Sequence, residues 1–292
     1  MNNIAVFGNC SQPRHRIDAI VDFFKLLDSS DFIVSVDRSF MEYLIQLAPS
    51  ISRFQMFDNI PGKCDVALSL GGDGTFLSTA RAIGLVGIPV AGINTGHLGF
   101  LADVDIADGE RLLKALSTGD YRTELRSVLT ASIIEGPGKI DAEAFALNEI
   151  AILRHETASM IEVKTVINDT PLADFRGDGL IVSTPTGSTG YNLSVGGPII
   201  EPSSSALSVA PIAPHSLSMR PVVVADTAVI DISIESRANS WRLSLDGQWI
   251  TLPVQTKVRI VKAPFSIKII HTAGHTFAST LRSKLLWGAA TF

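Results

Sequence analysis

A turn with three glycines around one aspartate, Gly71-Gly72-Asp73-Gly74-Thr75, constrains the fold of this chain more than any other stretch. The apolar run Val66–Leu70 comes before it and predicts a buried strand. Apolar residues at helical spacing follow, from Phe76 to Ile83, so the turn joins a strand to a helix. Glycines let the backbone approach a ligand closely, and they leave the N–H groups at the helix start free to bind phosphate.

Asp73 is the only side chain of this turn that can accept a proton or face a metal ion. An aspartate at the start of a helix can also be a simple cap, and that alternative stays open. A cap, however, does not need glycines on both sides. We therefore predict a functional carboxylate at Asp73 and phosphate-binding backbone at Gly71, Gly72, Gly74 and Thr75.

Strands and amphipathic helices alternate through the first third of the chain, with strands expected near residues 4–7, 32–36, 66–70 and 89–93. Such alternation with short connections predicts a mostly parallel sheet in a Rossmann-like α/β domain, here residues 1–103. Ligands of such sheets bind beyond the carboxyl ends of the strands. The Asp73 turn and the loop 94–100 both follow strand ends, which favours a binding site there.

The pattern changes after Leu116, because alternation with a period of two then dominates as far as residue 270. This part predicts a β-rich, β-sandwich-like domain of two packed sheets over residues 104–276. The tail, residues 277–292, has apolar spacing suited to packing back on the first domain. The expected fold class is therefore α/β followed by all-β.

Composition excludes several classes of protein. The 292 residues are 46% hydrophobic and 18% charged, with a formal net charge of −5, so we expect a folded soluble protein without a nucleic-acid or membrane partner. The apolar runs are far shorter than a membrane span, and the first seven residues do not resemble a signal peptide. Cys10 and Cys64 are isolated thiols, which indicates a reducing, cytoplasmic location.

The β-rich part contains an unusual loop, Ser183–Ser194, in which seven of the twelve residues carry a hydroxyl group. Many neutral hydrogen-bonding groups suit sugar hydroxyls and the edges of bases. A plain surface turn rich in serine and threonine is the alternative.

Three further polar pairs stand out in strand-like surroundings. Asn148-Glu149 interrupts an apolar strand, and neighbouring strand residues face opposite ways, so solvent exposure explains only one of the two. Arg176 and Asp178 flank a glycine and could be either a hairpin ion pair or part of a site. Asp246-Gly247-Gln248 is a typical type I′ hairpin signal and on its own favours a structural role.

Taken together, four motifs resemble those of the NAD kinases, and they occur in the same order. They are Gly71-Gly72-Asp73-Gly74-Thr75, Asn148-Glu149, the stretch Thr184–Tyr191, and Asp246-Gly247-Gln248. Diacylglycerol-type lipid kinases and phosphofructokinases carry similar glycine–aspartate turns, so the turn alone is not specific and the resemblance depends on the combination of all four motifs. The resemblance extends from the first strand to about Gln248.

The resemblance implies transfer of the γ-phosphoryl group of ATP, or of another donor, to the 2′-hydroxyl of the NAD adenosine ribose. It implies Asp73 as proton acceptor, Mg²⁺ bridging the triphosphate oxygens with no assigned protein ligand, and a homodimer or homotetramer. The residues that it implies for NAD binding are Asp73, Gly74, Phe100, Asn148, Glu149, Arg176, Asp178, Thr189, Gly190, Tyr191, Asn192, Leu193, Ser194 and Gln248.

Two residues depart from the family pattern: Gly190 stands where many members have alanine, and Ser159 where several have a basic residue or histidine. His97 is expected to line the pocket without binding a metal. A lipid kinase, which would need a cavity for acyl chains, and a non-catalytic NAD-binding regulator are the alternative functions. The intact Asp73 argues against the regulator.

Overall fold

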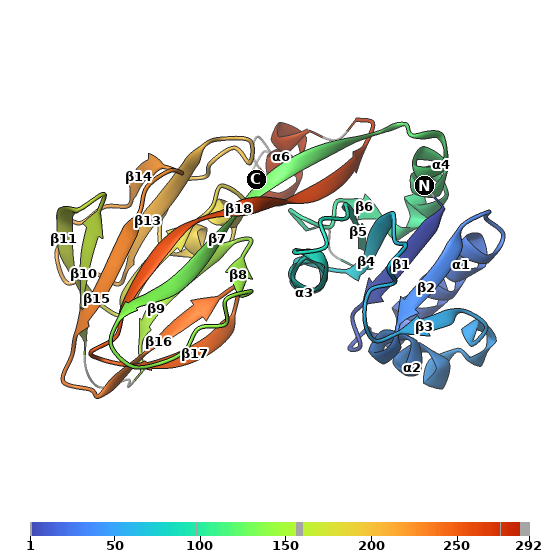
Figure 1. Ribbon diagram of the computed structural model, residues 1–292. Helices are drawn as coiled ribbons and strands as arrows, with labels where there is room; N and C mark the ends of the chain where they lie inside the picture. Colours follow the sequence, from blue (N-terminus) through green and yellow to red (C-terminus); the bar gives the residue numbers. More distant parts are fainter. Residues whose placement is uncertain (1, 97–98, 156–159, 275, 287–292) are drawn as a thin grey trace. The chain divides into compact units, whose positions relative to one another are not determined.

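The computed structural model describes residues 2–96, 99–155, 160–274 and 276–286 (Figure 1). His97, Ser159 and the end of the tail from Trp287 lie outside these described residues. The chain forms two compact units, residues 1–125 with 267–292 and residues 126–266. None of the described helices is long and apolar enough to cross a lipid bilayer.

The first unit is built on a parallel sheet with the strand order β5-β4-β1-β2-β3. Its strands are β1 (Asn3–Gly8), β2 (Ile33–Asp37), β3 (Gln55–Phe57), β4 (Val66–Gly71), β5 (Val90–Asn94) and the short β6 (Val104–Asp105), which pairs with β5. The expected parallel α/β fold is confirmed.

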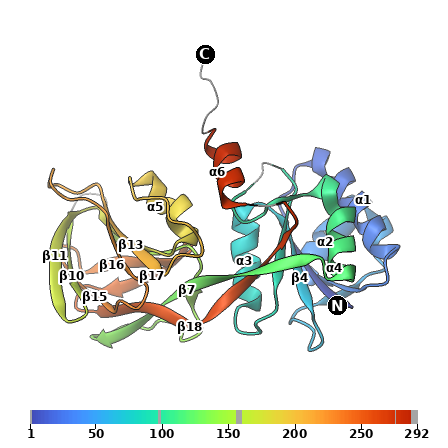
Figure 2. The same cartoon turned by 90° about the horizontal axis from the view of Figure 1, so that it is seen from above.

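Helices lie on both sides of this sheet, and in both views α3 is on the opposite side from α1 and α4 (Figures 1 and 2). The helices of the first unit are α1 (Ile17–Asp28), α2 (Arg38–Leu47), α3 (Asp73–Ile83), α4 (Gly109–Thr118) and α6 (Phe277–Leu285), with 3-10 turns η1 (Arg14–Arg16), η2 (Pro49–Ile51) and η3 (Ile106–Asp108). α1 buries Ile20, Phe24 and Leu27 at helical spacing, in one core with strands β1, β4 and β5.

The second unit contains antiparallel strands in two sheets, as expected for its β-rich sequence. One sheet has the order β11-β10-β15-β18, and the other has the order β14-β13-β12-β9-β16-β17. One hydrophobic core takes residues from both sheets, among them Ile150 and Val182 from one and Ile161 and Ile232 from the other. The two sheets therefore pack face to face.

The bounds of its strands are β7 (Tyr121–Glu135), β8 (Phe145–Ala146), β9 (Glu149–Arg154), β10 (Ile161–Ile167), β11 (Thr170–Gly177), β12 (Gly179–Ser183), β13 (Ala206–Ile212), β14 (Val222–Ala225), β15 (Ile230–Glu235), β16 (Ser240–Leu245), β17 (Gln248–Pro253) and β18 (Lys257–Thr272). The hydroxyl-rich loop forms the 3-10 turn η4 (Thr186–Thr189) and the short helix α5 (Tyr191–Ser194).

The boundaries between the two units lie after residues 125 and 266, whereas those of the expected domains lie after residues 103 and 276. α4 buries Leu112, Leu113 and Leu116 in the core of the first unit, so the segment after residue 103 belongs there. The later division point falls within the long strand β18, since residues from 267 onward belong to the first unit. The sequence pattern of β18 does not reveal this boundary, because the residues on both sides of it belong to the same strand.

Candidate functional site

The glycine–aspartate turn connects the fully buried β4 to the first residue of α3. Gly71 is required by packing, since an added Cβ would lie 2.2 Å from Oγ1 of Thr75. At Gly72 and Gly74 an added Cβ would have no neighbour within 4 Å. These two glycines therefore leave open space beside the N–H groups of the first helical turn, where an anion can approach.

Asp73 is not a simple cap of its own helix, because its carboxylate binds a different segment. Oδ2 accepts the backbone N–H of Phe100 at 2.9 Å, and Oδ1 accepts those of Leu101 and Ala102 at 2.9 and 3.2 Å. Asp73 is half-buried and lies in the first turn of α3, where the helix dipole favours a negative charge. Its carboxylate is therefore held in one orientation.

Two glycines make this contact possible. An added Cβ at Gly99 would lie 1.8 Å from Oδ1 of Asp73, and one at Gly92 of β5 would lie 2.6 Å from the carbonyl oxygen of Leu101. The expected proximity of the Asp73 turn and the loop after β5 is thus realised within the first unit. Phe100, the aromatic position predicted beside NAD, contributes its backbone N–H to Asp73 and is half-buried.

A buried histidine anchors the residue that follows this loop. The side chain of His271 is 2% exposed, with Nδ1 2.7 Å from Oδ2 of Asp103 and Nε2 3.2 Å from Oε2 of Glu124. Asp103 directly follows Ala102, so this contact also restrains the N–H groups that hold Asp73. The three residues lie in separate stretches and form no motif, so sequence reasoning did not find them.

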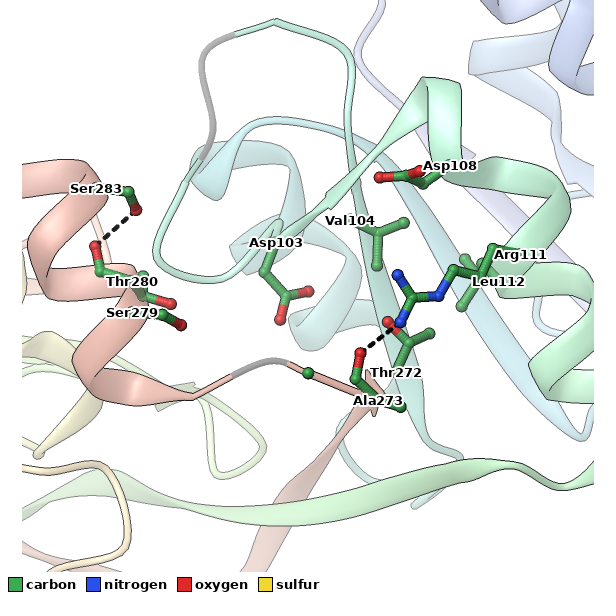
Figure 3. A pocket seen from close by; sticks show the side chains of 11 residues that line it. Asp103, Val104, Asp108, Arg111, Leu112, Thr272, Ala273, Ser279, Thr280 and Ser283 are labelled. Atoms are coloured by element: carbon green, nitrogen blue, oxygen red, sulfur yellow. Dashed lines mark hydrogen bonds between the residues drawn. The ribbon is translucent and has the colours of Figure 1, made fainter.

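Asp103 also lines a cavity of about 320 Å³ in the first unit, together with Arg111 of α4 and Ser279 and Ser283 of α6 (Figure 3). Arg111 donates a hydrogen bond to the carbonyl oxygen of Ala273 at 2.6 Å. α6, the described part of the expected returning tail, thus lies beside the loop that carries Asp103.

In the second unit, Asn148 and Glu149 are held by the hairpin between β16 and β17. The carboxylate of Asp246 accepts the backbone N–H groups of Leu147, Asn148 and Glu149 at 2.6, 2.9 and 3.0 Å. Asp246 and Gly247 both have positive φ, 47° and 81°, as a type I′ turn requires. The turn is as predicted, but its aspartate also positions two predicted site residues, which the sequence did not indicate.

Many hydroxyl groups of the Ser183–Ser194 loop hold the loop itself together. The buried hydroxyl of Thr184 donates to the carbonyl oxygen of Leu147 at 2.6 Å, and that of Ser188 donates to the carbonyl oxygen of Pro185, also at 2.6 Å. Asn192 is buried as well, and its Oδ1 accepts the hydroxyl of Ser208 at 2.9 Å. Within this loop, the predicted NAD-binding residues that remain partly or fully exposed are Thr189, Gly190, Tyr191, Leu193 and Ser194.

This loop packs directly on the Asn148-Glu149 pair. An added Cβ at Gly187 would lie 2.1 Å from the carbonyl oxygen of Asn148, and one at Gly190 would lie 3.3 Å from Oε2 of Glu149. Oδ1 of Asn148 and Oε2 of Glu149 are buried and have no hydrogen-bond partner among the residues that the structure describes. Two buried acceptors without donors are suited to a ligand that brings hydroxyl or amino groups.

The pKa of Glu149 is raised from 4.5 to about 7. Burial of the carboxyl is the main cause, the negative charge of Asp246 adds to it, and the backbone N–H of Tyr191 acts in the opposite direction. Glu149 therefore changes its charge near neutral pH.

Arg176 and Asp178 do not pair with each other, as a hairpin ion pair would require. Nε of Arg176 lies 2.7 Å from Oε2 of Glu162, and Oδ1 of Asp178 lies 3.1 Å from Nε of Arg154. Gln248 is exposed at the start of β17.

Comparisons with known proteins show which family the chain resembles. Residues 49–121 match the model of the ATP-NAD kinase N-terminal domain, and residues 147–272 match that of the ATP-NAD kinase C-terminal domain. A NAD kinase of Bacteroides fragilis is 42% identical over 286 residues, which cover 98% of each chain. The chain belongs to the NAD kinase family.

Two solved structures of NAD(H) kinases resemble this member of the NAD kinase family. Yeast NADH kinase complexed with NADH has a TM-score of 0.88 at 24% identity, covering 100% of this chain and 89% of the other, and shows that the fold is shared. An NAD kinase from Archaeoglobus fulgidus in complex with ATP has a TM-score of 0.70 at 26% identity, covering 98% and 97%. Membership of the NAD kinase family also separates the chain from the lipid kinases with a similar turn.

Replacing Asp246 by asparagine should lower the pKa of Glu149, because one of the two causes that raise it is a negative charge. Burial persists in this variant, so we expect a pKa between 4.5 and about 7. The measurement is an NMR titration of the Glu149 side-chain carboxyl. Asp141→Asn, at an exposed position of the same unit, is the control. An unchanged pKa in Asp246→Asn would contradict the assigned cause.

Proposed function

We propose that this chain is a NAD kinase that transfers the γ-phosphoryl group of ATP, or of another phosphoryl donor, to the 2′-hydroxyl of the adenosine ribose of NAD. The observation that carries the proposal is the nearly full-length similarity to relatives named NAD kinase. The neighbouring structures, in complex with NADH and with ATP, support a dinucleotide acceptor and a nucleotide donor.

Asp73 is the proposed proton acceptor. A ribose hydroxyl is a poor nucleophile at neutral pH, and a positioned carboxylate removes its proton as the bond to phosphorus forms. Phosphoryl transfer requires alignment and charge neutralisation more than covalent catalysis, so one oriented carboxylate is sufficient. The three backbone N–H groups of residues 100–102 supply that orientation.

The buried acceptors of Asn148 and Glu149 are proposed to receive hydrogen bonds from hydroxyl or amino groups of the dinucleotide. The remaining proposed NAD contacts are Gly74, Phe100, Arg176, Asp178, Thr189, Gly190, Tyr191, Asn192, Leu193, Ser194 and Gln248. The donor phosphates are proposed to contact Gly71, Gly72, Gly74 and Thr75. Mg²⁺ would be held mainly by the phosphate oxygens of the donor and by water, and it would neutralise part of the charge on the phosphoryl groups.

Among the described residues, no group of three or more His, Cys, Asp or Glu side chains is placed to hold a metal ion. The cytoplasm is the proposed location, because Cys10 and Cys64 are free thiols in the structure.

Replacing Asp73 by asparagine should lower kcat by roughly 10²- to 10⁴-fold, the usual contribution of a general base, and leave NAD binding nearly unchanged. NADP formation is measured with a coupled dehydrogenase assay, and NAD binding by calorimetry. Asp65→Asn is a matched control, because Asp65 also accepts backbone N–H groups, those of Asn2 and Asn3, but lies before β4 and away from the site. Full turnover by a folded Asp73→Asn protein would exclude the assigned role.

Affinity for NAD should increase as the pH rises from 6 to 8, because ionised Glu149 is the better acceptor and its pKa is about 7. Stability should change in the opposite sense. The folded protein holds this proton more tightly than the unfolded chain, so the stabilisation is complete below pH 4.5 and is lost as the pH rises through about 7. The difference is on the order of 3 kcal/mol.

Glu149→Gln should remove both pH dependences, which are measured by NAD titration and by urea unfolding between pH 4 and 8.5. Asn148→Ala should weaken NAD binding without changing the pH dependence. A Glu149→Gln protein that keeps the pH profile of the unaltered chain would refute the role of this carboxyl.

We further propose that the active unit is a homodimer or homotetramer, assembled through the β-rich unit, in which Asp178 contacts NAD bound mainly by another subunit. β11 is the edge strand of its sheet and ends at Gly177, beside Asp178. Leu172 of β11 is 39% exposed. Exposed edge strands tend to pair, and symmetric pairing brings the same turn from each subunit toward its neighbour.

Mixing Asp73→Asn and Asp178→Ala subunits should restore part of the activity, because some shared sites then contain both intact residues. The subunits are reassembled from mild denaturant, mixed oligomers are verified by mass spectrometry, and NADP formation is measured. Each variant reassembled alone is the control. Absence of recovery in verified mixed oligomers, or a fully active monomer, would rule out the shared site.

A further inference from the structure

The segments that follow β1 and β5 flank the glycine–aspartate turn on both sides. In the parallel sheet, Gly8 at the end of β1 is the register partner of Leu70, and Asn94 at the end of β5 is the partner of Gly71. The backbone N–H of Asn9 also donates to the carbonyl oxygen of Leu70 at 3.1 Å. Side chains that follow Gly8 of β1, and the side chain of Asn94 in β5, thus lie at the carboxyl ends of the strands, where such folds bind ligands.

Two buried side-chain amides at this edge have donors without partners. Gln12 is 6% exposed and Asn94 is 3% exposed. Oε1 of Gln12 accepts the hydroxyl of Thr95 at 2.9 Å, and Oδ1 of Asn94 accepts the backbone N–H of Gly96 at 2.7 Å. Nε2 of Gln12 and Nδ2 of Asn94, in contrast, have no partner within the described part of the chain.

The orientation of the Asn94 amide follows from its contact, because a backbone N–H can only donate and must face the oxygen. A buried donor without an acceptor costs roughly 1–3 kcal/mol. These two amides therefore favour a ligand that supplies acceptor oxygens.

A cation lies at the same edge. The guanidinium of Arg16 packs against the backbone of Gly96, where an added Cβ would lie 1.8 Å from Nη1 and 2.3 Å from Cζ. Arg38 and Arg53 of the same unit pair with Asp58 and Asp28, but Arg16 forms no ion pair with any described residue. The groups left unused by Gln12, Arg16 and Asn94 are therefore all donors, and one of them is positively charged.

We propose that Gln12, Arg16 and Asn94 form a subsite for the phosphate chain of the phosphoryl donor, beside the Gly71–Thr75 turn. The proposal rests on the proposed function for the identity of this ligand as donor. A chain of phosphoryl groups offers many anionic acceptor oxygens and needs no acceptor from the protein, which matches these side chains. Arginine binds phosphate oxygens with its planar fork of N–H groups. No bond forms or breaks at this subsite.

Binding of inorganic tripolyphosphate, measured by calorimetry, tests the subsite without any turnover. Arg16→Ala should weaken binding by roughly 10- to 100-fold, the value of a charge-assisted hydrogen bond, and Arg16→Lys should weaken it less. Asn94→Asp keeps an acceptor for Gly96 and replaces the unpaired NH₂ group by an anionic oxygen, so it should also weaken binding. Lys63→Ala is the control, since Lys63 is exposed and precedes the amino end of β4.

Unfolding midpoints verify that each variant is folded. Equal affinity of folded Arg16→Ala, Lys63→Ala and unaltered protein, or no binding to the unaltered protein, would overturn the proposal.

Steady-state kinetics distinguish the two sources of such a chain, a nucleoside triphosphate and inorganic polyphosphate. Arg16→Ala should raise the KM of the donor by at least tenfold and change the KM of NAD by less than twofold. A rise for both donors supports a subsite for the phosphate chain itself, and a rise for ATP alone supports a nucleotide subsite.

A rise in the KM of NAD without one for the donor would overturn the proposal while the kinase function stands. If the unaltered protein does not phosphorylate NAD, the proposed function fails, and the tripolyphosphate titration still tests the subsite.

Discussion

The contact between the Asp73 carboxylate and three successive backbone N–H groups, those of residues 100–102, organises the candidate site of the first unit. It forms only because Gly99 and Gly92 have no side chain, since a Cβ at either position would collide with Asp73 or with the loop itself. It also depends on the parallel pairing of β4 and β5, which brings Gly71 and Asn94 into register. The sheet therefore sets where the loop begins, and the carboxylate sets where it lies.

The second unit contains the same kind of contact, a carboxylate that accepts three successive backbone N–H groups. Asp246 holds the N–H groups of residues 147–149 as Asp73 holds those of residues 100–102. In both units a charged acceptor satisfies backbone donors that no strand or helix uses, and such bonds are about twice as strong as neutral ones. Asp246 has a second effect, since its charge raises the pKa of Glu149. The hairpin aspartate thus positions the Asn148-Glu149 pair and also adjusts the charge of one member.

The sequence predicted the parallel sheet, the turn around Asp73 and the β-rich second part, because each depends on local periodicity or on neighbouring residues. It wrongly placed Asn148-Glu149 within one strand, since Asn148 lies in a bend between β8 and β9 and Glu149 is the first residue of β9. It did not predict the role of Asp246, which is 97 to 99 residues from the N–H groups that it holds. Nor did it show that Arg176 and Asp178 pair with Glu162 and Arg154. Composition suggested many available hydroxyls in the loop Ser183–Ser194, whereas Thr184 and Ser188 use theirs to hold the loop. Long-range pairing decides these points, and it leaves no local pattern.

Buried side-chain atoms without a partner among the described residues include both acceptors and donors. Oδ1 of Asn148 and Oε2 of Glu149 in the second unit are acceptors, whereas Nε2 of Gln12 and Nδ2 of Asn94 in the first unit are amide donors. Each such atom destabilises the folded protein by a cost that a simple apolar replacement would avoid. A ligand relieves that cost only if it brings the complementary group: hydroxyl or amino donors for the first pair, and anionic oxygens for the second. The proposed reaction, which joins a ribose hydroxyl to a phosphoryl group, needs one substrate of each kind, and this is the basis on which the two sets of atoms are assigned in the proposals above.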